Sequence, residues 1–306
     1  MGDNVYKSAD ELSAILEARG VILDIDPIPL LLREGYYALI NGYKEPFLDR
    51  SAMQSCAEDQ FLPGTKLSEI YGLFHFDRQL RESLFPYLVH AETTIRSVVV
   101  DSFCSKHREI DSYLRPCNYV DERWMLFPKH FRGDKCEAHR RGIARLIKMF
   151  KKKTQVSENS PAYIQHHLKR YGCIPLWVLQ NNLTFGNVKH FYQLLERDVQ
   201  AHSSRTIQEL SGNQQDRMEP QDLLQAIEVL VDFRNICAHN DRLYCARPRG
   251  RDFGEMFHSL WRVLPASEML ELLNTLNSVL QTHPTISCNR IVLEIAKTMG
   301  ASLRPL

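Results

Sequence analysis

The chain has 306 residues, of which 44% are hydrophobic and 25% charged, with 14 Gly and 14 Pro. This composition is ordinary for a globular protein and excludes collagen-like, low-complexity and wholly disordered chains. The 38 basic and 37 acidic residues nearly cancel. A basic coat over the whole surface is therefore excluded, and any site for a polyanion has to be a local patch.

The sequence shows no targeting or membrane-spanning segment. The best apolar stretch near the start, residues 21–32, is interrupted by Asp24 and Asp26 and is shorter than the roughly 20 residues that cross a bilayer. The first residues lack the basic and apolar regions of a secretory signal. Eight cysteines form no CxxC pair, which favours a reducing compartment. We expect a cytoplasmic protein that does not bind membranes.

The first part of the chain predicts short helices separated by breaks. Ser8 can cap a helix whose apolar residues follow at spacings of three and four. Pro27 and Pro29 are expected to break the chain before a second helix at 30–39. Residues 40–47, which contain Gly and Pro, predict a turn.

The middle of the chain begins with a long helix, predicted over residues 66–106, in which Pro86 can introduce a kink. Residues 108–133 have irregular spacing with two prolines and a glycine, and predict an insertion of loops and short helices. Helical periodicity then predicts helices at 135–153, 162–171, 187–195 and 204–210, with a polar linker at 156–161.

The last third contains the strongest helical pattern, at 222–238, which Pro220 precedes at a position that favours a helix start. Residues 247–254 are rich in Arg and Gly and predict a loop. Two further helices are predicted at 266–282 and 289–299.

The fold class follows from the whole pattern. No run of residues predicts a strand convincingly, and no repeat of fixed period is present. We therefore predict an all-α protein with an N-terminal helical region at 1–65 and a helical domain at 66–306, interrupted by the insertion around 108–133.

The motifs of several enzyme classes are absent. GxGxxG, GxxxxGK[ST], GxSxG and HExxH do not occur, so nucleotide-binding, hydrolase and zinc-protease chemistry has no support. Two CxxH pairs, Cys104 with His107 and Cys136 with His139, leave a four-ligand zinc site open as an alternative. No further ligand cluster accompanies them, so we expect no metal and no cofactor.

The strongest local signal is the segment 234–244, at the C-terminal end of the best predicted helix. The planar guanidinium of Arg234 suits phosphate oxygens. The imidazole of His239 can give or take a proton near neutral pH. Asn235 is four residues before His239 and shares its helix face, so its amide can orient the imidazole or a phosphate.

Two interpretations of this segment are open. Arg234 can pair with a nearby acid while His239 sits at a helix terminus, where the dipole favours a cation. Alternatively, the two residues form an active site. They are five apart, about 140° around an ideal helix, and do not stack in one regular helix. In that case the helix bends or ends at His239, or a second copy of the motif completes the site across a symmetric interface.

The surrounding residues resemble a known family. R-N-x-x-A-H is followed by Arg242-Leu243-Tyr244, which is similar to the R-N-x-x-x-H motif of HEPN ribonucleases, and in particular to the abortive-infection (Abi-like, AbiD/AbiF type) family. Asn240 departs from the second His that frequently follows the motif. Three further stretches are similar to that family and occur in the expected order, at residues 35–47, 70–81 and 91–97.

The resemblance implies a HEPN-type helical bundle and a metal-independent endoribonuclease of a phage-defence or toxin–antitoxin system, some of whose members are restrained by a partner RNA. It also implies a homodimer in which two motifs meet in one composite site. His239 would then act as general base or acid, Arg234 would stabilise charge at phosphorus, and Asn235 would support them.

RNA binding is predicted for two basic segments. Residues 129–153 contain ten basic and two acidic residues, and an Arg-rich stretch follows the motif. The alternatives are a solvated helix face and a mobile surface loop. The residues that we predict to bind RNA are Arg140, Arg141, Arg145, Lys148, Lys151, Lys152 and Lys153 in the first segment, and Arg242, Arg247 and Arg249 in the second, with Arg251 beside them.

Two smaller alternatives stay open. Glu92 and Arg96 are four apart and favour a structural ion pair, with support of the active site as the less favoured interpretation.

The rival for the function of the whole protein is a non-catalytic helical module that binds RNA or a partner protein through the same basic surfaces.

Overall fold

The computed structural model describes residues 5–54, 58–127, 131–155, 160–212, 217–284, 289–301 and 303. Helices are the regular elements of these residues, and two isolated bridges, Ile22 with Lys66 and Leu48 with Phe61, take the place of strands. The prediction of an all-α fold is confirmed for the described residues. The expected linker at 156–161 lies largely outside them, as does Lys129 of the basic segment.

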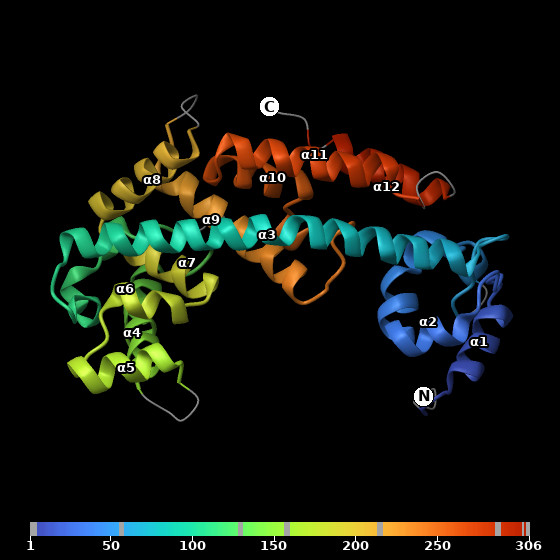
Figure 1. Ribbon diagram of the computed structural model, residues 1–306, viewed down its shortest axis with the longest axis horizontal. Helices are drawn as coiled ribbons and strands as arrows, with labels where there is room; N and C mark the ends of the chain where they lie inside the picture. Colours follow the sequence, from blue (N-terminus) through green and yellow to red (C-terminus); the bar gives the residue numbers. More distant parts are fainter. Residues whose placement is uncertain are drawn as a thin grey trace. The chain divides into compact units, whose positions relative to one another are not determined.

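The chain forms two compact units, each built from segments that are distant in sequence. Unit 1 comprises Met1–Leu84, Ile236–Ala246 and Leu273–Leu306, and unit 2 comprises Phe85–Asn235 and Arg247–Leu272. Three helices pass from one unit into the other: α3 (Leu67–Lys106), α9 (Pro220–Ala238) and α11 (Ala266–Thr282) (Figure 1). The predicted division into regions 1–65 and 66–306 stays a prediction.

Unit 1 begins with a well-capped helix, α1 (Ala9–Ala18). The Ser8 hydroxyl accepts a hydrogen bond from the Glu11 backbone N–H, and the Glu11 carboxylate accepts one from the Ser8 backbone N–H. This capping box satisfies two amide groups that the helix leaves unpaired. The other elements that lie wholly in unit 1 are α2 (Pro27–Glu34), a π-helical turn (Tyr37–Asn41), the 3₁₀ helices Glu45–Phe47 and Ala52–Gln54, and α12 (Arg290–Ala301).

The second helix differs from its prediction at both ends. α2 starts at Pro27, earlier than the predicted residue 30, because the Asp26 side chain caps it and proline fits the first helical position. It ends at Glu34, earlier than the predicted residue 39, because Gly35 has a φ of 79° and leaves the helical conformation. In place of the predicted turn at 40–47, the chain forms the end of the π-helical turn Tyr37–Asn41 and the 3₁₀ helix Glu45–Phe47.

Helix α3 is predicted correctly over its whole length of 40 residues and continues through Pro86. Proline has no N–H, so the i−4 carbonyl loses one helical hydrogen bond. The boundary between the two units falls between Leu84 and Phe85, next to this residue.

Unit 2 contains the remaining helices. In the described residues between α3 and the next α-helix, only three 3₁₀ helices occur, at Ser112–Leu114, Pro116–Asn118 and Glu122–Trp124. Two further 3₁₀ helices lie at Gln180–Asn182 and Pro248–Gly250. The α-helices are α4 (Lys135–Thr154), α5 (Ala162–Tyr171), α6 (Leu176–Leu179), α7 (Phe185–Leu194), α8 (Arg197–Ser211) and α10 (Phe253–Val263).

An aromatic cluster fixes α4 in unit 2. Phe150 of α4 meets Phe191 of α7 edge-to-face with ring centroids 5.6 Å apart, and Phe191 meets Phe103 of α3 at 5.2 Å. These three side chains are fully buried. Aromatic pairs of this geometry add to the free energy of burial, so the core holds α4 in a defined orientation.

None of the described helices combines the length and the apolar character that crossing a bilayer requires.

Candidate active site and basic surface

Helix α9 carries the R-N-x-x-x-H motif at its C-terminal end. Pro220 occupies the first position of the helix, and Leu223, Ile227 and Leu230 are fully buried in unit 2. Arg234 and Asn235 follow within the last two turns. The burial of the apolar face therefore fixes the direction in which the motif leaves the core.

The helix ends in a left-handed cap. Asn240 has a φ of 57°, its N–H donates to the Cys237 carbonyl at 3.4 Å, and the Asp241 N–H donates to the Ile236 carbonyl at 3.0 Å. These two bonds define a Schellman motif in which His239 is the C-cap, directly after the last helical residue, Ala238. Asn tolerates the left-handed conformation better than most residues, which gives Asn240 a structural role in place of a second motif histidine.

Arg234 is held by two side chains within unit 2. Its Nε donates to Oε2 of Glu92 at 2.8 Å, and its Nη1 donates to Oδ1 of Asn235 at 3.2 Å. The Glu92 side chain, on α3, is only 6% exposed, whereas that of Arg234 is 28% exposed. In the described part of the chain, Nη2 has no hydrogen-bond partner. The guanidinium is therefore oriented by two neighbours and keeps donors for an anion.

This arrangement changes the interpretation of Glu92. The predicted pair with Arg96 is loose, with 3.7 Å between Nη1 and Oε1, and Arg96 also donates to the Leu183 carbonyl. The shorter contact of Glu92 is with Arg234. The geometry thus favours support of the motif arginine over a purely local ion pair.

His239 is exposed within unit 1, and Asn235 is exposed within unit 2. No hydrogen bond or ion pair joins the His239 side chain to another described residue. The boundary between the units falls between Asn235 and Ile236, so Arg234 and Asn235 belong to unit 2 and His239 belongs to unit 1. Neither Arg234 nor His239 is buried in its own unit, as access by a substrate requires.

A buried carboxylate organises the segment that follows the motif in unit 1. Asp77 is fully buried on α3 and pairs with Arg81 one turn later. It accepts from the Tyr43 hydroxyl at 2.7 Å and from the backbone N–H groups of Leu243 at 3.1 Å and Tyr244 at 2.7 Å. Two of the three further family-like stretches and the R-L-Y segment thus meet at one side chain.

The charge state of this network follows from its surroundings. Burial raises the pKa of Asp77, and the positive charge of Arg81 together with the hydrogen bonds opposes that rise. Burial also raises the pKa of Tyr43, so its hydroxyl stays protonated and donates. The Tyr43 ring stacks on Tyr244 at 5.7 Å, and Arg242 donates to the Gly42 carbonyl at 3.0 Å. The segment after His239 is therefore anchored.

The arginines of the predicted loop at 247–254 are mostly paired within unit 2. Arg249 contacts Asp232 at 2.8 Å, and Arg251 contacts Glu228 at 2.8 Å. Arg251 and Glu228 are 12% and 4% exposed, so this pair is nearly buried. Arg247 is exposed. The expected loop ends at Asp252, which caps α10, and RNA binding by Arg247 and Arg249 stays a prediction.

Helix α4 presents its basic residues differently. Lys153 is half-buried and donates to the Asn182 carbonyl, and burial lowers its pKa. Arg141 pairs with Glu137 on the same helix. Among the described residues, no hydrogen bond or ion pair holds the other five side chains, all of them exposed: Arg140, Arg145, Lys148, Lys151 and Lys152.

The two CxxH pairs do not form a common site. His107 Nε2 lies 2.8 Å from a Glu196 carboxylate oxygen, and His139 Nε2 lies 2.7 Å from the Val120 carbonyl oxygen. Burial raises the pKa of Cys104 to about 11, which disfavours the thiolate that a metal needs. In the ranges that the structure describes, no three His, Cys, Asp or Glu side chains are grouped to hold a metal ion.

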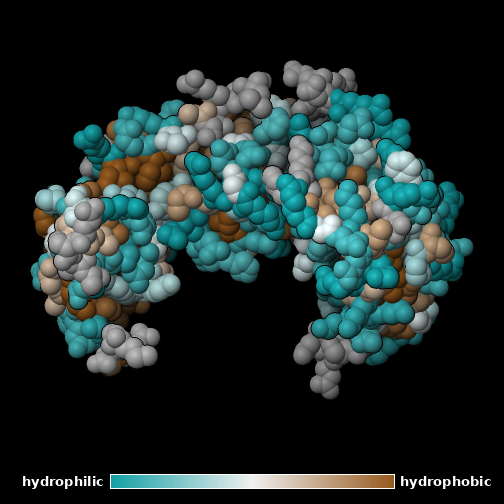
Figure 2. All heavy atoms as spheres, turned by 180° about the vertical axis from the view of Figure 1, so that it is seen from behind, coloured by the Kyte–Doolittle hydropathy of each residue, from teal (hydrophilic) through white to brown (hydrophobic). Residues whose placement is uncertain are grey.

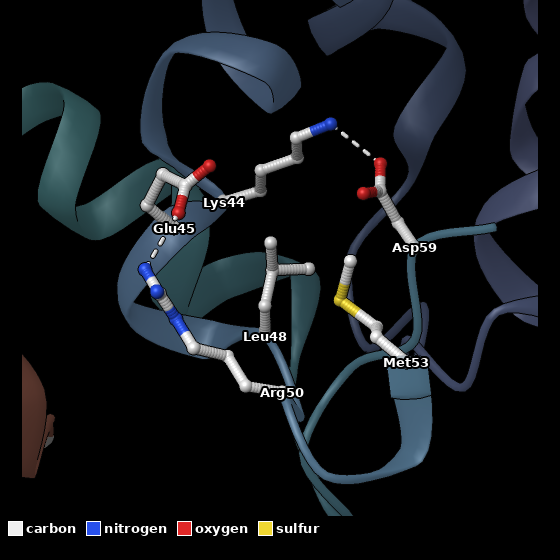
Figure 3. A pocket seen from close by; sticks show the side chains of 6 residues that line it. All are labelled: Lys44, Glu45, Leu48, Arg50, Met53 and Asp59. Carbon is white, nitrogen blue, oxygen red and sulfur yellow. Dashed lines mark hydrogen bonds and ion pairs between the residues drawn. The ribbon is translucent and has the colours of Figure 1, made fainter. Parts of the chain in front are cut away.

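A pocket of about 370 Å³ lies in unit 1, lined by two ion pairs and two apolar side chains (Figure 3). Lys44 pairs with Asp59 at 2.5 Å and Arg50 pairs with Glu45 at 3.2 Å, while Leu48 and Met53 supply the apolar part. Because its charged groups already have partners, the pocket offers no unpaired group to select a ligand.

The geometry described so far is that of an all-α protein with an oriented arginine and an exposed histidine at one helix terminus. A family model described as "Abi-like protein" matches residues 29–245, more than two thirds of the chain. The protein therefore belongs to the Abi-like family, and this membership suggests a role in abortive infection. No curated protein and no solved structure matches the chain.

Two organising residues were not identified from the sequence. Asp77 and Arg81 lie within the family-like stretch 70–81 and have opposite charges four residues apart, a signal that could have indicated a pair. The bonds from Asp77 to Leu243 and Tyr244 join residues more than 160 positions apart, and no local pattern reports them.

Proposed function

We propose that this Abi-like protein is a metal-independent endoribonuclease that acts in abortive infection. The observation that carries the proposal is the R-N-x-x-x-H motif at the end of α9, with Arg234 oriented by buried Glu92 and with His239 exposed. A guanidinium with free donors suits a phosphate, and an exposed imidazole suits proton transfer.

RNA carries its own nucleophile, so the reaction needs no Ser, Cys or metal. One imidazole takes the proton of the 2′-hydroxyl while its oxygen attacks the adjacent phosphorus. The bond from phosphorus to the 5′-oxygen breaks, and a protonated imidazole gives a proton to that leaving oxygen. The products are a 2′,3′-cyclic phosphate and a 5′-hydroxyl, and the Arg234 guanidinium stabilises the extra negative charge at phosphorus.

Two imidazoles are required at once, one as base and one as acid. A single motif supplies only His239, so we place the reaction in a homodimer whose two motifs meet. In this proposal the protein is a defence toxin, and an antitoxin RNA could restrain it by occupying the same site.

The test compares the wild-type protein with the His239→Ala variant on mixed RNA. We expect the variant to lose cleavage, because proton transfer by a positioned side chain contributes about 10²–10⁴-fold. Wild-type cleavage should persist in EDTA and leave cyclic phosphate ends. DNA, which has no 2′-hydroxyl, should stay intact.

The matched control is His166→Ala, which removes another exposed imidazole, on α5, and should leave cleavage unchanged. Cleavage that survives His239→Ala, or that EDTA abolishes, would contradict the proposal.

A second candidate function is a non-catalytic RNA-binding module, and the exposed basic residues of α4 favour it. This alternative predicts RNA binding by the wild-type protein with no cleavage under any condition. It also predicts that His239→Ala leaves RNA binding unchanged, since no catalytic step depends on that imidazole.

A further inference from the structure

Helix α4 gathers six of its eight Lys and Arg residues on one side. At 100° per residue, positions 141, 145, 148 and 152 fall within about 60° of one another, and positions 140 and 151 form a neighbouring row. The first row spans about 16 Å along the helix at 1.5 Å per residue. The residues on this side are Arg140, Arg141, Arg145, Lys148, Lys151 and Lys152, and we call them the α4 basic face.

Among the described residues, Arg141 of the α4 basic face pairs with Glu137, and no hydrogen bond or ion pair holds the side chains of the other five. Like charges that are four residues apart on a helix repel one another and destabilise it. Elsewhere in unit 2, Arg234, Arg249 and Arg251 meet carboxylates of their own unit. The α4 basic face is therefore a local concentration of uncompensated positive charge in a chain of formal net charge +1. In the view of Figure 2, hydrophilic residues predominate on the part of unit 2 that carries α4 and α5.

An exposed aromatic residue lies beside this helix. Trp124 is 53% exposed and carries the Arg197 guanidinium over its ring, 4.8 Å from the centroid. The 3₁₀ helix Glu122–Trp124 packs against α4. At Gly142, an added Cβ would lie 3.4 Å from the Leu194 side chain and 3.9 Å from that of Met125, the neighbour of Trp124. The 3₁₀ helix that carries Trp124 is thus packed against the basic helix, and about half of the Trp124 side chain is open to solvent.

We propose that the α4 basic face and Trp124 together bind single-stranded RNA. The cations contact successive phosphates, and an unpaired base stacks on the indole. Basic grooves with an aromatic platform bind single strands in this way, and stacking requires a base that is not held in a duplex. The choice of RNA over single-stranded DNA rests on the proposed function, whereas the binding surface itself does not.

The test uses full-length protein carrying His239→Ala, so that RNA stays intact, and a fluorescent single-stranded RNA of mixed sequence. Lys148→Ala/Lys151→Ala/Lys152→Ala should weaken binding. It should also reduce the slope of log K against log salt by about 2, since each phosphate contact on a single strand contributes about 0.7. Trp124→Ala should weaken binding about tenfold with little change in slope.

The matched control removes three other exposed lysines, Lys7, Lys66 and Lys297, with the same change of net charge. It should leave the slope unchanged. Replacement of the three α4 lysines by Arg keeps the charge and should keep binding, which separates a lost surface from a misfolded protein.

Three outcomes would overturn the inference. The first is the same salt slope for the triple α4 variant and the triple control variant. The second is equal affinity for duplex and single-stranded RNA. The third is binding of anionic lipid vesicles by a protein that does not bind RNA. If the wild-type protein binds RNA through α4 but never cleaves it, the result contradicts the proposed function alone. If the wild-type protein cleaves RNA but the triple α4 variant keeps the wild-type salt slope, the result contradicts this inference alone.

Discussion

The Arg234 guanidinium is oriented because a buried carboxylate and an amide each accept from a different nitrogen. Glu92→Gln keeps the size of the side chain and removes its charge, so Arg234 loses the stronger of its two anchors. We expect kcat for RNA cleavage to fall about 10–100-fold with a smaller change in KM, since misplacement by about 1 Å can cost 10²-fold. Steady-state cleavage assays measure this split.

The control for Glu92 is Asp101→Asn, which removes one negative charge from an exposed position of the same helix in unit 2. It should leave kcat unchanged. A Glu92→Gln protein that unfolds at the same urea concentration as wild type and cleaves RNA at the wild-type rate would show that Glu92 does not position Arg234.

Asp77 is the centre of a buried network in unit 1, and its loss should be strongly destabilising. Asp77→Asn leaves Arg81 buried without its counter-ion, and the removal of one partner from a buried ion pair costs about 3–5 kcal/mol. Tyr43→Phe removes one hydrogen bond of the same network and should cost about 1 kcal/mol. Urea unfolding of both variants measures the difference.

Asp10→Asn, at an exposed position of α1, serves as the control and should stay within about 0.5 kcal/mol of wild type. If Asp77→Asn cost no more than Tyr43→Phe, Asp77 would not be the centre of the network.

At the scale of the element, the C-terminal cap of α9 places His239. Asn240 holds a left-handed conformation, which costs most L-residues about 1–2 kcal/mol and glycine little. Asn240→Gly should therefore leave the free energy of unfolding within a few tenths of a kcal/mol of wild type, whereas Asn240→Ala should lower it by about 1 kcal/mol. Urea unfolding tests this order, and equal losses for the two variants would contradict the cap.

The contact between α2 and α3 gives a pH dependence. Arg78 donates to both carboxylate oxygens of Glu34, which is 8% exposed, and this bond lowers the pKa of Glu34 from its ordinary value of 4.5. Because the pKa is lower in the folded chain, the stabilisation is complete above pH 4.5 and is lost as the pH falls through the lowered value.

Glu34→Gln should therefore destabilise the protein at about pH 6 and have little effect near pH 3. Urea unfolding at several pH values measures this difference, with Glu17→Gln on α1 as an exposed control. A difference between Glu34→Gln and wild type that did not change with pH would exclude the ion pair as its cause.

Local patterns explain how much of the fold could be predicted. Helices such as α3, α4, α5 and α9 bury an apolar face, so the spacing of their apolar residues reveals them. The start of α2 was misplaced because proline can begin a helix as well as break one, and the capping role of Asp26 decides between the two. Helix α10 was missed because the Arg- and Gly-rich stretch before it hides the cap at Asp252.

The site was predictable only in its local part. The motif residues and the end of α9 follow from a short segment of sequence. The partners that orient or neutralise charged groups come from far along the chain: Glu92 is 142 residues from Arg234, and Glu228 is 23 residues from Arg251. The sequence therefore identified which residues carry charge, and the structure identified which of those charges are already paired.

At the scale of the whole molecule, the proposed chemistry requires two copies of the chain. One motif offers one imidazole, and the attack and departure of the two oxygens call for a base and an acid. The measurable consequence is that an inactive subunit also inactivates the wild-type subunit with which it pairs. If His239→Ala and wild-type chains exchange freely, each mixed dimer contains one incomplete site and does not cleave RNA.

When the two chains are mixed in equal amounts, random pairing puts half of the wild-type chains into mixed dimers, so activity per wild-type chain should fall to about one half. With a ninefold excess of the variant, activity per wild-type chain should fall to about one tenth. The mixtures are equilibrated at a concentration where light scattering shows a dimer, and cleavage is then measured at constant wild-type concentration. An inactive protein unable to pair, such as serum albumin, controls for crowding. Activity per wild-type chain that stays constant across the mixtures would mean that each chain carries a complete site, and the composite site would have to be abandoned.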